Sequence, residues 1–215
     1  MTSTIDTAAL HDWISRFAVA MNDNREWLTE LDSAIGDADH GANMARGMAA
    51  VVDKLDAGAP ETIDELLKGV GMTLVSSVGG ASGPLYGTFF LRMGMTAGAV
   101  PTLDAASLAT ALRAGLDGVV ARGKAEAGDK TMYDAMAPAV DALDSTLAAG
   151  AGLAAALVAA ADAAAAGRDA TRPLVARKGR ASYLGERSAG HLDPGAASTA
   201  ILFETLAAAA QDAAG

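Results

Sequence analysis

Apolar residues recur at spacings of three and four along most of the chain, which is the period of an α-helix with one buried face. The first such face is the clearest, and its members are Leu10, Trp13, Ile14, Phe17 and Met21. Asp6 or Thr7 stands where its N-cap is expected. The same spacing predicts further helices over about residues 24–33, 44–55, 62–78, 84–99, 101–120, 132–143, 153–166 and 196–213. Val75 is expected on the buried face of the helix that begins near Thr62.

The segments between the predicted helices are mostly short, and short connections favour antiparallel packing of consecutive helices. Alanine makes up about a quarter of the chain and aromatic residues 4%, a composition that favours helices over sheets. No stretch shows a convincing strand pattern, residues 170–195 show no clean period, and no linker or repeat divides the chain. We therefore predict an all-α fold of eight or nine helices in a single domain that covers residues 1–215.

Charge and cysteine content narrow the function. The formal net charge is −10 and the sequence pI is about 4.6, which disfavours nucleic-acid binding because such proteins usually present a basic face. The absence of cysteine excludes disulfides, thiolate metal sites and cysteine nucleophiles. The most apolar stretch, residues 151–166, contains Asp162 and is too short to span a membrane. Because the N-terminal residues lack the pattern of a signal peptide, we expect a soluble cytoplasmic protein.

Three carboxylates, Asp32, Asp37 and Asp39, fall within eight residues in the break between the second and third predicted helices. Like charges this close repel one another unless a cation lies among them. Magnesium is a better match than calcium, because the residues after Asp37 do not follow the EF-hand pattern and because Mg²⁺ completes its shell with water and phosphate oxygens. On composition alone, a polar loop with aspartates as turn formers is an equally good interpretation.

Two other breaks have the composition of phosphate-binding segments. Residues 76–87 are rich in glycine and serine and lead into a predicted helix, whose free N–H groups favour a phosphate. A tight turn between helices would use the same residues. Residues 176–195 concentrate basic side chains in an otherwise acidic chain, and arginines can meet phosphates. A solvated charged loop is the alternative, but the length of this segment favours a functional role.

A near match to a P-loop, Gly118–Ala125, overlaps the start of the break at residues 122–132. We reject the P-loop because Ala125 replaces the required Ser or Thr and because the segment continues a helix instead of following a strand. In an antiparallel bundle, the breaks after the second, fourth, sixth and eighth helices emerge at the same end. The sequence therefore predicts that all four unusual breaks meet at one end of the fold.

Five segments carry distinctive motifs, namely Gly36–Met44, Ser76–Pro84, Gly128–Met132, Ala176–Ser188 and His191–Ala196. In order and spacing they resemble the nucleotide-binding L subunit of dihydroxyacetone kinase. The resemblance extends from about Leu10 to Leu206 and shows no departure at the motif positions. The alanine-rich residues 148–170 are divergent but lie outside the motifs.

The resemblance implies a closed barrel of eight antiparallel helices that binds an adenine nucleotide, ADP or ATP, and two Mg²⁺ ions in loops at one end. Asp32, Asp37 and Asp39 would hold the metal ions. Arg180 would reach the phosphates or the transferring group, so the three aspartates and Arg180 are the candidate catalytic residues. Arg177 is the alternative to Arg180 for stabilising the transferring group. The implied nucleotide contacts are His40, Gly41, Ala42, Asn43, Ala81, Ser82, Gly123, Met132, Arg180, Asp193, Pro194 and Gly195.

The resemblance also implies a kinase activity that depends on partners. In one arrangement of the family, the nucleotide module and the dihydroxyacetone-binding module share a polypeptide and consume ATP. In the other, the module is a separate subunit that keeps ADP bound, is rephosphorylated by a phosphotransferase-system protein with phosphoenolpyruvate as the source, and serves a dihydroxyacetone-binding partner subunit. A chain of 215 residues resembles the second arrangement. A stand-alone ATP-dependent subunit for another ketose such as erythrulose and a nucleotide-sensing regulatory subunit are the alternatives, and a homodimer is left open.

Overall fold

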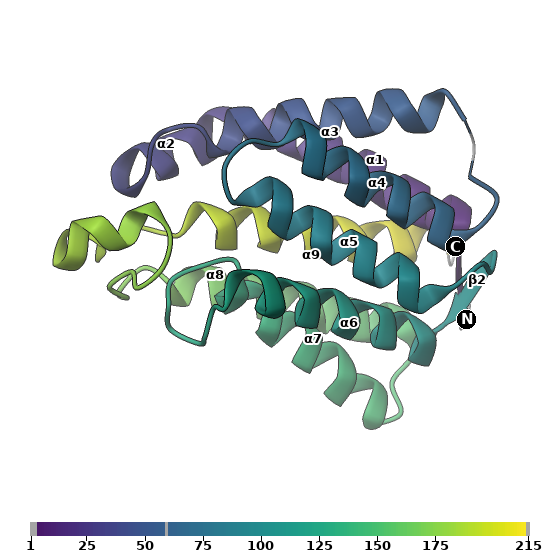
Figure 1. Cartoon of the computed structure of the whole chain (residues 1–215). Helices are drawn as coiled ribbons and strands as arrows, with labels where there is room; N and C mark the ends of the chain where they lie inside the picture. Colours follow the sequence, from purple (N-terminus) through teal and green to yellow (C-terminus); the bar gives the residue numbers. More distant parts are fainter. Residues whose placement is uncertain (1–3, 59, 214–215) are drawn as a thin grey trace.

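The computed structural model describes residues 4–58 and 60–213, which are mostly helical (Figure 1). Within these residues lie nine α-helices: α1 (Thr7–Asp23), α2 (Arg25–Ile35), α3 (His40–Asp56), α4 (Ile63–Ser77), α5 (Ser82–Ala97), α6 (Ala105–Gly123), α7 (Tyr133–Ala148), α8 (Leu153–Ala170) and α9 (Pro194–Asp212). The all-α prediction is confirmed. That residues 1–215 form a single domain stays a prediction.

Eight of the described helices form a closed ring. Each helix from α3 to α9 packs against the next, and both α3 and α9 pack against α1, which closes the ring. Neighbouring helices around the ring run in opposite directions (Figure 1). This arrangement is the barrel of eight antiparallel helices that the family resemblance implied.

The second helix does not follow the antiparallel pattern. Only Asn24 separates α1 from α2, and α2 extends beyond the end of α1 instead of turning back along it (Figure 1). It packs against α3, α9 and the 3₁₀ segment η1 (Arg180–Ser188). The apolar spacing of residues 24–33 indicates a helix but not its direction. A connection of one residue leaves too little chain for an antiparallel turn.

Aspartates begin three of the helices. Asp6 accepts a hydrogen bond from the backbone N–H of Ala9 at 2.8 Å, and Asp104 and Asp193 cap α6 and α9 in the same way. Such caps satisfy N–H groups that have no partner in the first turn of a helix. Of the two cap candidates at the first helix, Asp6 is the cap.

Large apolar side chains from all eight ring helices fill the centre of the ring. Trp13, Phe17 and Phe90 are fully buried, and the indole N–H of Trp13 donates to the backbone carbonyl of Leu202 at 2.9 Å, which links α1 to α9. The prediction that Val75 is buried is wrong, because its side chain is 47% exposed. Leu74 lies on the buried face of α4. Val75 is the next position around the helix and lies at the edge of that face.

Two strands of three residues each pair at the end of the ring where the described chain begins (Figure 1). β1 (Thr4–Asp6) runs antiparallel to β2 (Thr102–Asp104), with Ile5 opposite Leu103. The expectation of no strand is therefore wrong, because three residues are too few to show the alternation that reveals a strand. β2 also displaces the start of the sixth helix from Pro101 to Ala105.

None of the described helices combines the length and the apolar character that a membrane crossing requires. Of the N-terminal residues on which the cytoplasmic expectation depended, residues 1–3 lie outside the described residues.

Candidate functional site

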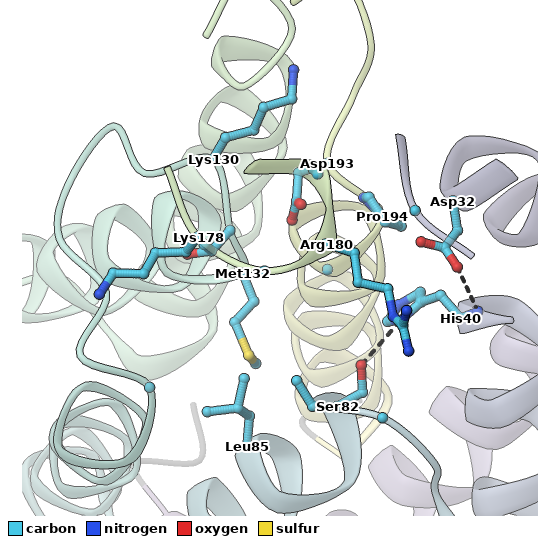
Figure 2. Close-up of a pocket in the computed structure, with 18 of the residues that line it drawn as sticks. Asp32, His40, Ser82, Leu85, Lys130, Met132, Lys178, Arg180, Asp193 and Pro194 are labelled. Atoms are coloured by element: carbon cyan, nitrogen blue, oxygen red, sulfur yellow. Dashed lines mark hydrogen bonds between the residues drawn. The ribbon is translucent and has the colours of Figure 1, made fainter. Parts of the chain in front are cut away.

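The four unusual breaks of the sequence line one pocket of about 910 Å³ at one end of the ring (Figure 2). They are the acidic turn (residues 32–39), the glycine turn (residues 79–82), the connection between α6 and α7 (residues 124–132) and the basic segment (residues 171–193) that joins α8 to α9. They follow α2, α4, α6 and α8, as the alternation of helix directions requires. The predicted meeting of these breaks at one end is confirmed. The volume is within the range of pockets that bind small ligands and cofactors.

The acidic turn brings its three aspartates together. Asp32, on the last turns of α2, and Asp37 and Asp39, before α3, each offer a carboxylate oxygen within 4.8 Å of the others. The Oδ2 atom of Asp32 accepts hydrogen bonds from the backbone N–H groups of Asp39 at 2.8 Å and His40 at 3.1 Å. These bonds fix Asp32 against the start of α3. The cluster has the hard oxygen donors that Mg²⁺ prefers.

Arg180 reaches the acidic turn from the basic segment. It begins η1, its side chain is 69% exposed, and it forms an ion pair with Asp37 in which Nε lies 2.8 Å from Oδ2. Arg177, Lys178 and Tyr183 from the same segment also line the pocket. The pocket thus has acidic and basic groups at one place, which is the combination that a metal-bound polyphosphate requires.

His40 joins the pocket wall to a buried chain of hydroxyl groups. Its Nδ1 lies 3.1 Å from Oγ of Ser82, and its Nε2 lies 2.9 Å from Oγ of Ser198, which in turn lies 2.7 Å from the hydroxyl of Tyr86. Burial lowers the pKa of His40 against the opposing charges of Asp32 and Asp39, and burial raises the pKa of Tyr86 to about 12. Both groups are therefore neutral near pH 7, and the network fixes the start of α3 against α5 and α9.

The glycine turn leads directly into the first turn of α5. Gly80 has a φ of +67°, a left-handed conformation that glycine adopts without a steric penalty. No side chain caps α5, and Ala81, Ser82 and Pro84 at its start line the pocket. The first residues of α3 and α9, His40 and Pro194, line the same pocket. Three helix N-termini, each with a partial positive charge, therefore meet here.

An apolar wall completes the pocket. Leu85 from α5 and Met132, just before α7, point toward one another (Figure 2). Val119 and Gly123 of α6 also line the pocket, and a Cβ at Gly123 would lie 3.1 Å from Cδ2 of Leu85. Apolar walls of this kind suit the planar base of a nucleotide. Met132 and Gly123 were predicted from the family resemblance, whereas Leu85 and Val119 were not. Their spacing looks like that of core positions, so no signal distinguished them.

Asp193 lies at the inner side of the pocket, where it caps α9. Burial, together with the charges of Asp134 and Asp32, raises the pKa of its carboxyl to about 7, although its bond to the N–H of Ala196 and the charge of Lys130 act in the opposite direction. The carboxyl is therefore partly protonated at neutral pH. The sequence analysis named Asp193 only as an implied nucleotide contact.

Most of the predicted site residues line the pocket, namely Asp32, Asp37, Asp39, His40, Ala81, Ser82, Gly123, Met132, Arg180, Asp193, Pro194 and Gly195. Gly41, Ala42 and Asn43 do not. Gly41 packs against α2, where a Cβ would lie 2.1 Å from the carbonyl oxygen of Arg25, and Oδ1 of Asn43 accepts from Arg46. Contact of these three residues with a nucleotide stays a prediction.

Comparison with known proteins fits this geometry. Residues 34–208, which run from the acidic turn into α9, match the family described as the DAK2 domain. The chain belongs to the DAK2 family. The ADP-binding subunit DhaL of the PEP-dependent dihydroxyacetone kinase of Escherichia coli (strain K12) is 49% identical over 201 residues, which cover 94% of this chain and 96% of that protein. The ADP-binding subunit DhaL of the PTS-dependent dihydroxyacetone kinase of Lactococcus lactis is 46% identical, with the same coverage of 94% and 96%.

A solved structure shares this fold. The crystal structure of the dihydroxyacetone kinase from C. freundii in complex with AMP-PNP and Mg²⁺ has a TM-score of 0.67 and 30% identity to this chain. The similarity covers 91% of this chain and 33% of that one, so this chain spans about a third of the length of the C. freundii protein.

Proposed function

We propose that this chain is the ADP-binding subunit of a phosphoenolpyruvate-dependent dihydroxyacetone kinase. In this role it transfers a phosphoryl group from a magnesium-bound adenine nucleotide to dihydroxyacetone held by a partner subunit. The observation that carries the proposal is the convergence of three carboxylates and Arg180 in a pocket of about 910 Å³ that also has an apolar wall. The two bacterial subunits that match almost the whole chain support it.

The acidic turn fits the metal site that this function requires. Asp32, Asp37 and Asp39 would share two Mg²⁺ ions, and their oxygens already lie within 4.8 Å of one another. The hydrogen bonds from two backbone N–H groups hold Asp32 in place for this task. When bound, Mg²⁺ would neutralise the negative charge on the phosphate oxygens.

The shape of the pocket suggests how the nucleotide lies. The base would pack between Leu85 and Met132, where the wall is apolar. The phosphates would lie toward the acidic turn, at the N-termini of α3, α5 and α9, whose partial positive charges favour anions. In this orientation Ala81, Ser82 and Gly195 would lie along the phosphates.

Arg180 is the group that would stabilise the transferring phosphoryl. Its guanidinium lies beside Asp37, within reach of a phosphate held by the acidic turn. Arginines in this role contribute about 10³–10⁵ in rate in other phosphoryl-transfer enzymes. The aspartates position the nucleotide, and Arg180 meets the charge of the group that moves.

The partners follow from the same orientation. A dihydroxyacetone-binding subunit would dock at the pocket end, where Arg180 and Tyr183 are exposed, and a phosphotransferase-system protein would return a phosphoryl group to the bound ADP. Such an assembly would operate in the cytoplasm, and this chain alone would lack kinase activity.

Nucleotide retention tests the proposal directly. The purified chain, desalted in the presence of Mg²⁺, is expected to keep bound ADP. Asp37→Asn is expected to weaken Mg²⁺-dependent ADP binding by about 100-fold, because loss of a ligand should cost at least as much as loss of a group that orients one. Asp162→Asn, at an exposed position of α8, is the matched control and should bind ADP like the unmodified chain. Calorimetric titration measures both.

Unchanged ADP binding by Asp37→Asn would contradict the metal site and the proposal with it. The alternatives give different results with the unmodified chain. Free exchange of bound nucleotide with ATP, and transfer to a ketose without phosphoenolpyruvate, would favour an ATP-dependent subunit. Failure of the chain to support turnover in a mixture of purified partner subunits, with ADP still bound, would favour a regulatory subunit.

A further inference from the structure

A buried lysine holds the two ends of the basic segment together. Lys130, in the connection between α6 and α7, is 1% exposed. Its ammonium donates to the backbone carbonyls of Ser188 at 2.7 Å, His191 at 2.6 Å and Leu174 at 3.1 Å, and a fourth carbonyl, that of Arg172, lies at 3.4 Å. The ion pairs found among the described residues do not include it. All of its hydrogen bonds therefore go to backbone carbonyls of a single segment.

These carbonyls lie on both sides of the pocket-lining part of that segment. Residues 172–174 follow α8, residues 188–191 precede α9, and Arg180 lies between the two stretches. Two further hydrogen bonds join the two ends of the segment. The N–H of Gly190 donates to the carbonyl of Arg172 at 2.7 Å, and the N–H of Ala176 donates to Oγ of Ser188 at 2.8 Å. The segment is thus a loop closed at its base, with the ammonium at the centre of the closure.

The residue that closes the loop also belongs to the opposite wall of the pocket. Lys130 precedes Met132 by two positions, and the carbonyl of its neighbour Asp129 accepts from the N–H of Arg177 at 3.0 Å. The backbone of Lys130 has a φ of +62°. Residues with a side chain rarely adopt this conformation, so surrounding contacts must maintain it. Lys130 points away from the pocket, whereas Arg180 points into it (Figure 2).

We infer that Lys130 is a positioning residue for phosphoryl transfer: by tying the carbonyls at the base of the basic segment, it holds Arg180 over the phosphate end of the pocket. The inference rests on the proposed function for the role of Arg180. A compact ammonium with three donors suits a site where several carbonyls converge from different directions, whereas a planar guanidinium does not. Charge-assisted hydrogen bonds of this kind are among the strongest in proteins, and an apolar replacement leaves the carbonyls without partners.

Limited proteolysis tests whether Lys130 keeps the basic segment closed, and it requires neither nucleotide nor partner. Trypsin cleaves after Arg177, Lys178 and Arg180 once the segment opens locally. Lys130→Met is expected to speed cleavage after Arg180 by about tenfold or more, because local opening loses the bonds that opposed it. Trp13→Phe, which removes a buried hydrogen bond between α1 and α9, is the control and should leave cleavage in the segment unchanged. Cleavage of Lys130→Met at the unmodified rate would overturn the inference.

Steady-state kinetics with the purified partner subunits separates positioning from general destabilisation. Lys130→Met is expected to lower kcat by about tenfold or more, with less than threefold change in the affinity for Mg²⁺-ADP. In an Arg180→Met background, the same substitution is expected to lower kcat by less than about threefold, because its effect passes through Arg180. Additive losses in kcat, or a loss confined to nucleotide affinity, would overturn the inference. Absence of transfer by the unmodified subunit would instead refute the proposed function, while proteolysis still decides the role of Lys130.

Two further measurements guard against a variant that does not fold. Lys130→Arg keeps the charge but not the shape of the ammonium, so it is expected to restore part of the protection from trypsin and little of kcat. In the unmodified chain, amide exchange at Ala176, Arg177 and Gly190 is expected to be slow with and without nucleotide. Exchange of these amides at the rate of an open loop would overturn the inference without any substitution.

Discussion

Gly36, the residue after α2, determines where the side chain of Asp32, a candidate metal ligand, can lie. A Cβ at Gly36 would lie 2.0 Å from Oδ1 of Asp32, a distance that forces the carboxylate to move. Gly36→Ala is therefore expected to weaken Mg²⁺-dependent ADP binding by about 10–100-fold, the usual range when the orientation of a metal ligand is lost. Calorimetric titration of ADP at fixed Mg²⁺ measures the change.

A second glycine gives the matched control. Nothing lies within 4 Å of a Cβ built at Gly58, which follows α3 at the other end of the ring, so Gly58→Ala should bind ADP normally. Equal affinities for Gly36→Ala and the unmodified chain would show that Asp32 does not hold a metal ion in this position.

At the scale of residues, side chains with distinctive chemistry could be placed from the sequence and apolar ones could not. The three aspartates and Arg180 stand out by charge in short breaks, and they do meet in the pocket. Leu85 looks like any core residue of a helix, so its place in the wall needed the structure. Lys130 lies in the Gly128–Met132 motif, but its burial was not predictable, because a single lysine in a break is normally exposed.

At the scale of elements, α7 and α8 approach each other closely at Gly167. A Cβ there would lie 2.2 Å from the carbonyl oxygen of Asp134. That carbonyl precedes Pro138 by four positions, and proline has no N–H to donate to it. Gly167→Ala is expected to lower the free energy of unfolding by about 1–3 kcal/mol, as overpacking does. Urea denaturation followed by circular dichroism measures it.

Gly69 provides the comparison for that substitution. It lies within α4 with nothing within 4 Å of a Cβ, so Gly69→Ala is expected to raise stability by up to about 1 kcal/mol through helix propensity. A gain in stability from Gly167→Ala as well would show that α7 and α8 can separate without cost.

Helices were predictable as elements because each has an apolar stripe over three or more turns. The strands β1 and β2 were not, since three residues carry no period. The direction of α2 also escaped the sequence, because the connection at Asn24 had to be seen before the continuation of α1 could be distinguished from a turn. Short elements and connections are set by tertiary contacts, which local spacing does not record.

At the scale of the whole molecule, Asp193 links stability to pH. Its pKa is about 7 in the folded chain, mainly because of burial, and about 3.9 in an unfolded chain. Between these values the folded state keeps a proton that the unfolded state has released, so this group makes stability fall as the pH rises from about 4 to about 7, with no further change above. Asp134 and Asp32 raise the pKa, and Lys130 opposes them.

Asp193→Asn isolates this contribution, because asparagine keeps a cap acceptor but does not titrate. Relative to the unmodified chain, the variant is expected to become progressively more stable as the pH rises from about 4 to about 7. Urea denaturation at several pH values, with a chelator and without nucleotide, measures the difference. Parallel stability curves for the two proteins would show that Asp193 ionises normally in the folded state.

The meeting of four distant breaks was predictable at this scale because it depends only on alternation. Each pair of helices returns the chain to the same end, so errors of a few residues in the helix bounds do not change the result. The prediction is correct although α2 continues beyond α1 instead of packing antiparallel to it, because α1 and α2 together run toward the pocket end (Figure 1). Which side chains touch within the pocket depends on details of loop conformation that alternation does not determine.

The closed ring also places both ends of the described chain at the side remote from the pocket (Figure 1). The last turn of α9 is held there, because Arg16 pairs with Asp212 at 2.7 Å. A fluorophore or an affinity tag attached at either terminus would therefore leave the pocket rim clear. The subunit could be immobilised on a sensor surface with that rim facing solution, an orientation suited to measuring how other proteins dock on it.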